Sequence, residues 1–142
     1  MRHLLLCAFV LLAACARPDY LTADDITPST NIHLLEKQNL YFDLKWVQGP
    51  QTPDVSEFIL HFWQKDISSS SGPFVDPVGD LSVVLWMPSM GHGSAPVKIE
   101  KLEPGVYRVH SVYFIMPGDW EIQVYLKNGN QILDQKFVGL IL

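Results

Sequence analysis

The chain is poor in cysteine and has only one extended apolar run, close to its start. Its 142 residues include two cysteines, Cys7 and Cys15. With so few thiols, the chain cannot be held together by a disulfide framework. Beyond Cys15 there is no thiol left for catalysis or metal binding. The stability of this part of the chain must therefore come from a packed core.

Clusters of basic residues and the common catalytic motifs are also missing. Ten lysines and arginines stand against fifteen acidic residues, which gives a formal net charge of −5. Without a basic cluster, nucleic acid is not an expected partner. The sequence has no Gly-x-Ser-x-Gly elbow, no zinc-type ligand spacing and no phosphate-binding loop. We therefore expect a protein that is not an enzyme.

The first fifteen residues have the layout of a secretory signal. The positive start Met1-Arg2-His3 is followed by an apolar run over 4–12 and by two small residues before Cys15. This run is too short for a membrane-spanning helix, which needs about 20 residues, so cleavage is expected. Leu-Ala-Ala-Cys at 12–15 resembles the lipobox of bacterial lipoproteins. The resemblance implies that residues 1–14 are a signal peptide and that Cys15 is acylated.

Acylation would place the protein on a membrane outside the cytoplasm. Each buried CH₂ contributes about 0.8 kcal/mol, so several acyl chains together hold a protein firmly. Ala16 follows the cysteine, where Asp commonly marks inner-membrane retention in Gram-negative lipoproteins. We therefore expect the periplasmic face of the outer membrane if the source is Gram-negative. The Pro-, Asp- and Thr-rich region that follows Cys15 predicts a lipidated, flexible tether over 15–33 and a single domain over 34–142.

The predicted domain has the period-two alternation of β-strands. Large apolar residues alternate with other residues, and Asn128-Gly129-Asn130 is a strong hairpin signal because Asn and Gly tolerate positive φ. No segment has a convincing helical pattern. The sequence therefore predicts an all-β, antiparallel, seven-stranded β-sandwich that is immunoglobulin-like in general architecture. The predicted strands cover 40–47, 58–63, 80–87, 97–100, 106–115, 119–126 and 131–140.

The methionines that follow Cys15 lie at strand ends and in turns. Two of them belong to the segment Met-Pro-Ser-Met-Gly-His-Gly-Ser at 87–94, and the third belongs to Phe-Ile-Met-Pro-Gly-Asp-Trp at 114–120. Loops of alternate connections gather at one end of an antiparallel sandwich. We therefore expect these two segments to lie close together.

Methionine and histidine together suit copper. A thioether is a soft, neutral ligand that favours Cu(I), and imidazole is a borderline nitrogen donor. Neither is liable to the oxidative pairing that threatens cysteine outside the cytoplasm. Glycines on both sides of the histidine let the backbone turn sharply and present its ring. The predicted copper ligands are Met90, His92 and Met116, with Met87 and His110 as further candidates.

Ordinary packing is an alternative for several of these residues. Met87 falls on the same strand face as Leu85, which is typical of the core. Met116, before Pro-Gly, fits equally well as a plug at the end of the sandwich. His61 alternates with core residues, which indicates a structural or surface role. The alternative function is therefore a metal-free structural or protein-interaction module of the cell envelope.

Three segments together resemble the YtkA-like domain family, which is related to the FixH group. They are the segment at 87–94 followed by Pro96, Leu-Glu-Pro-Gly-Val-Tyr at 102–107, and Phe-Ile-Met-Pro-Gly-Asp-Trp-Glu-Ile at 114–122. The resemblance implies a small extracytoplasmic β-sandwich, often anchored to a membrane. FixH-type relatives are associated with copper supply to cytochrome oxidase, so it also implies copper handling at Met90, His92, Met116 and Met87. Here a lipid anchor replaces the FixH-type membrane helix, so we expect copper buffering, or delivery to an envelope protein, rather than oxidase assembly.

Overall fold

The structure, a computed structural model, describes residues 31–65 and 72–142. The predicted signal peptide 1–14, the lipidation site Cys15 and residues 16–30 of the predicted tether lie outside the described residues. Within the described ranges, no helix is long and apolar enough to cross a membrane.

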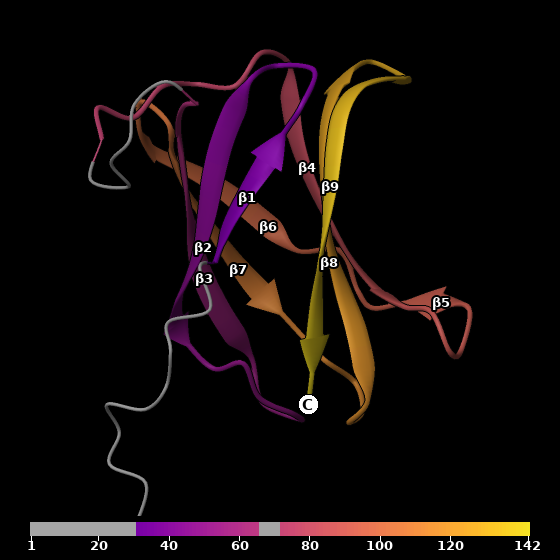
Figure 1. The fold of residues 1–142 in the computed structure, drawn as a ribbon. Coiled ribbons are helices and arrows are strands. Elements are labelled where there is room, and N and C mark those ends of the chain that lie inside the picture. The colour runs from indigo at the N-terminus through magenta and orange to yellow at the C-terminus, as the bar shows by residue number, and fades with distance from the viewer. Residues whose placement is uncertain (1–30, 66–71) are drawn as a thin grey trace, which may run out of the picture.

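Nine strands form two antiparallel sheets that pack face to face (Figure 1). Sheet A has the order β1-β2-β3-β7-β6, and sheet B has the order β5-β4-β8-β9. The described residues contain no helix. The strands are β1 (Ile32–Leu35), β2 (Leu40–Gln48), β3 (Ser56–Gln64), β4 (Asp80–Met87), β5 (His92–Gly93), β6 (Lys98–Glu103), β7 (Val106–Val112), β8 (Asp119–Asn128) and β9 (Gln131–Ile141).

The predicted all-β antiparallel sandwich is confirmed, with nine strands rather than seven. The seven predicted segments correspond to β2, β3, β4, β6, β7, β8 and β9. The two additional strands, β1 and β5, are four and two residues long. Such short segments carry too few alternations to show period two. Strand β1 begins inside the segment predicted as tether, and it pairs with the start of β2.

The core lies between the two sheets and is built from every second residue of the longer strands. In β8, for example, Trp120, Ile122, Val124 and Leu126 are all buried, and the residues between them are not. Burying each such side chain stabilises the fold by about 1.5–3 kcal/mol. Phe42, Phe58, Phe62 and Phe114 add aromatic bulk to the same core.

His61 has the structural role that its pattern indicates. Its Nδ1 lies 2.6 Å from the Asp43 carboxylate on the neighbouring strand. Its ring also stacks on Phe74, with the ring centroids 4.9 Å apart. Asp43 belongs to β2, and Phe74 belongs to the loop that follows β3. His61 therefore helps to hold this loop against sheet A.

Candidate functional site

The hairpin between β4 and β5 presents the segment at 87–94. The Met90 and Gly91 amides donate to the Met87 carbonyl at 3.1 and 3.0 Å, which closes a tight turn. Gly91 has a φ of 66°, which glycine adopts without steric cost. The hairpin projects from the side of the sandwich (Figure 1). Met90 therefore sits at the tip, where it is 56% exposed.

Met87 and His92 are direct partners in the pairing of β4 with β5. Directly opposed residues of antiparallel strands place their side chains on the same face, with Cβ atoms about 4.5–5.5 Å apart. Met87 is only 2% exposed and belongs to the core, so this shared face is the inner face of sheet B. The half-buried His92 therefore lies beside Met87, at the rim of the core.

The His92 ring is held by its own backbone. Its Nδ1 lies 3.2 Å from the Gly93 carbonyl oxygen. With Nδ1–H donating to this carbonyl, the lone pair is on Nε2, and Nε2 has no hydrogen-bond partner in the described part of the chain. Metal-binding histidines commonly use this arrangement, in which a carbonyl fixes the tautomer and the ring orientation.

The loop between β7 and β8 closes the same end of the sandwich. The Ser94 hydroxyl donates to the Tyr113 carbonyl and joins the hairpin to this loop. Trp120 Nε1 donates to the Met116 carbonyl at 2.9 Å. The methyl of Met87 lies only 3.0 Å from the position that a Cβ on Gly118 would occupy. The segments around Met90 and Met116 therefore meet, as their sequence positions predict.

The predicted ligands occupy different environments. Met87 is a core residue, in agreement with the packing alternative. Met116 is half-buried and packs against the core, which leaves part of its side chain accessible at the sandwich end. Met90 is exposed in the turn of the hairpin, and His92 is half-buried in β5. The structure thus places Met87 beside His92 and brings the Met87 side chain to the loop that carries Met116, while Met90 lies at the tip of the projecting hairpin.

The fifth candidate, His110, lies on β7 of sheet A. Its neighbour Val109 is completely buried, so His110 points to the outer face of that sheet. It faces the Glu57 and Arg108 ion pair, in which Arg108 Nε lies 2.7 Å from Glu57. Hydrogen bonding from Arg108 lowers the pKa of Glu57, and the nearby His110 adds to this effect. The structure does not bring His110 together with the methionines.

Comparison with protein families matches residues 37–125 to the YtkA-like family. The match spans more than half of the chain. The chain belongs to the YtkA-like family. The matched region of this YtkA-like chain runs from the turn before β2 into β8 and contains Met87, Met90, His92 and Met116. No curated protein matches the sequence.

Among residues 31–65 and 72–142, no three His, Cys, Asp or Glu side chains are placed to share an ion. Methionine is not among those ligand types. Thioether and imidazole groups, which fit a soft metal ion, occur together in the segment at 87–94 as Met87, Met90 and His92.

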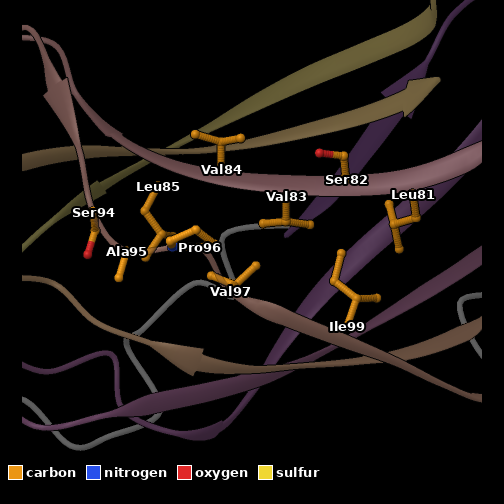
Figure 2. Close-up of a pocket in the computed structure, with 10 residues that line it drawn as sticks. All are labelled: Leu81, Ser82, Val83, Val84, Leu85, Ser94, Ala95, Pro96, Val97 and Ile99. Carbon is orange, nitrogen blue, oxygen red and sulfur yellow. The ribbon is translucent and has the colours of Figure 1, made fainter. Parts of the chain in front are cut away.

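A groove that the sequence did not indicate runs along the side of the YtkA-like sandwich. Its volume is about 320 Å³, and it lies between β4 and the segment that connects β5 to β6. Figure 2 shows Leu81, Val83 and Leu85 of β4 pointing toward the connecting segment and β6, with Val84 on the other side of the strand. At one end, the Ser94 amide donates to the Leu85 carbonyl at 3.1 Å. The apolar lining includes Leu81, Val83, Leu85, Ala95, Val97 and Ile99, together with Pro96.

Proposed function

We propose that this YtkA-like protein is a lipid-anchored, non-enzymatic protein outside the cytoplasm that binds copper through methionine and histidine. It buffers the metal or delivers it to a partner in the envelope. The observation that carries the proposal is the pairing of Met87 with His92 beside the loop that holds Met116. Such an arrangement would let Met116 and the hairpin residues Met90 and His92 approach one metal ion.

The proposed ligands are Met90, Met116 and Nε2 of His92. The carbonyl of Gly93 would keep Nε2 available by holding Nδ1, and the thioethers would favour Cu(I). The exposed position of Met90 suits a site from which the metal must leave again. Met87 would support the site from the core side, and His110 has no part in it because it points to the outer face of sheet A.

The proposed lipid anchor and the proposed copper site are both consistent with copper delivery at the membrane surface. An acylated Cys15 would fix the chain to the membrane, while the tether over 15–33 would let the domain reach other envelope proteins. The FixH-type resemblance of segments 87–94 and 114–122 supports copper as the metal. Because no thiol follows Cys15, soft-metal binding would fall to the methionines.

A titration of the purified full chain with Cu(I) under a competing chelator tests this proposal. We expect the wild type to withdraw copper from the chelator, and the double variant Met90→Ala/His92→Ala to bind at least about tenfold more weakly. Ser89→Ala, in the same turn, is the matched control and should bind as the wild type does. Equal affinities of the wild type and the double variant would exclude the site.

A metal-free interaction module is the second candidate, and the groove of Figure 2 favours it. The groove is lined by apolar side chains and borders the part of β4 that β5 does not cover. An uncovered strand edge can accept an added strand from another protein. If the Cu(I) titration shows no specific affinity, this candidate takes precedence, and Ala95→Arg, at an exposed position of the groove lining, should then abolish partner binding.

A further inference from the structure

A second hollow lies on the outer face of sheet B, at the same end as the methionines. Its volume is about 370 Å³, and Gly139 lies in its lining. Gly139 is the register partner of Glu121, and nothing lies within 4 Å of the position of a Cβ added to it. The missing side chain therefore helps to create the hollow. Pro88 and Ile141 contribute apolar walls.

Two carboxylates, Asp119 and Glu121, line the same hollow. They are two residues apart on β8, so they lie on one face of the strand, about 6–7 Å apart along it. Glu121 accepts a hydrogen bond of 2.8 Å from the Gln123 amide, and Gln123 accepts one of 2.8 Å from the Tyr125 hydroxyl. This chain of contacts holds the Glu121 carboxylate in place. Across residues 31–65 and 72–142, no lysine, arginine or histidine forms an ion pair with either carboxylate.

We infer that this hollow binds basic side chains of a partner protein, presented on an extended segment with arginine or lysine at every second position. The spacing of such side chains matches that of Asp119 and Glu121, because both lie on extended backbone. The aliphatic stems would pack against Pro88 and Ile141, and the cationic ends would reach the carboxylates. Arginine fits best because its guanidinium binds a carboxylate through two parallel hydrogen bonds.

The position of the hollow links it to the proposed copper site, and its role in delivery rests on that proposed function. Pro88 directly follows Met87, and Asp119 directly follows Gly118, which contacts Met87. A partner seated here would lie on the outer face of sheet B, next to the chain segments that carry Met87 and Gly118. Opposite charges also speed and orient protein association. The hollow would thus select the protein that exchanges copper with this one.

The probe for this inference is the peptide acetyl-Gly-Arg-Val-Arg-Gly-amide, added to the full chain at low salt. We expect saturable binding, with NMR shifts concentrated at Asp119, Glu121, Gly139 and Ile141. Asp119→Asn/Glu121→Gln should weaken binding at least about tenfold. The control Glu100→Gln/Glu103→Gln removes two exposed carboxylates from sheet A and should bind like the wild type. A peptide with citrulline in place of arginine should not bind.

Gly139→Val provides a steric test that leaves every charge in place. The added side chain would enter open space rather than the core, so the fold should persist while peptide binding is lost. Equal binding by Gly139→Val, or by the citrulline peptide, would overturn the inference. Free arginine amide that binds as tightly as the peptide would also overturn it, in favour of a small-molecule cation site.

Copper binding and peptide binding can fail separately. Asp119→Asn/Glu121→Gln should keep the Cu(I) affinity of the wild type, and Met90→Ala/His92→Ala should keep its peptide affinity. Loss of peptide binding in the methionine and histidine variant would contradict a separate docking hollow. Absence of Cu(I) binding in a protein that still binds the peptide would refute the proposed function and leave the docking site intact.

Discussion

Met87 and His92 face each other across the hairpin of β4 and β5, with both side chains on the inner face of sheet B. Met87 continues this face into the core, and its methyl contacts the turn at Gly118. His92 occupies the rim, where its Nε2 is available. Met87 thus packs in the core and also lies beside His92. A substitution at Met87 should therefore affect both the stability of the core and the position of the His92 ring.

Replacing Met87 separates its packing role from any ligand role. Met87→Ala should lower the free energy of unfolding by about 2–5 kcal/mol, because it leaves a cavity in the core. Met87→Leu conserves the volume and should cost less than about 1.5 kcal/mol. Urea unfolding measures both values. If Met87→Leu folds normally but loses Cu(I) affinity, the Met87 sulfur is a ligand; unchanged affinity assigns it to packing alone.

His33 should make the fold less stable in mild acid. Its Nε2 is buried without a hydrogen-bond partner among the described residues, and its ring lies against Phe42. Burial lowers the pKa of His33, Lys136 on β9 lowers it further, and Asp43 on β2 opposes them. The unfolded chain therefore binds the proton more readily. Stability should be complete above the unfolded pKa of about 6.5 and decrease as the pH falls below it.

Urea midpoints at about pH 7.5 and pH 5.5 measure this loss. His33→Phe keeps an aromatic ring beside Phe42 and should flatten the pH dependence. A wild type and a His33→Phe variant with the same pH dependence would contradict the assignment.

Asp76 should control the ionisation of Tyr107. Its carboxylate accepts hydrogen bonds from Lys101 Nζ at 2.6 Å, the Gly105 amide at 2.8 Å and the Tyr107 hydroxyl at 3.0 Å. Burial and the bond to Asp76 raise the pKa of Tyr107 to about 12. In Asp76→Asn the carboxylate charge is lost, so this pKa should fall toward its ordinary value of about 10.

The ultraviolet absorbance of phenolate, titrated against pH, follows this change. Subtracting the titration of Tyr107→Phe isolates the Tyr107 signal from that of the other tyrosines. A Tyr107 pKa that is unaltered in Asp76→Asn would mean that burial alone raises it.

Cys15 should be the acylated residue. Cells that express the chain and are fed labelled palmitate should incorporate the label, and Cys15→Ser should abolish incorporation. Cys7→Ser is the matched control, because Cys7 lies in the predicted signal peptide and should not affect labelling. Labelling that persists in Cys15→Ser, or that is absent from the wild type, would refute the lipoprotein prediction.

Most of the strand framework could be predicted because it depends on a local pattern. Alternation of buried and accessible residues, as in Trp120, Ile122, Val124 and Leu126, is visible in the order of side chains along one strand. Strands β1 and β5 escaped prediction because each is too short to display that alternation and is defined by its hydrogen-bonded partner. The hollow beside Gly139 escaped for a related reason: its walls come from segments far apart in the chain. The groove of Figure 2 is lined by residues between 81 and 99, but it depends on how β4 and the segment before β6 lie in space.

By itself, the sequence determined the sandwich class, the lack of a thiol beyond Cys15 and the presence of two Met-containing segments between strands. These features follow from composition and short-range order. Only the tertiary structure decided which side chains share a surface. It placed His92 beside Met87, turned His110 to the opposite sheet's outer face and set Asp119 and Glu121 around an open space. Strand register and sheet packing fix these positions, and both arise from contacts between residues far apart in the chain.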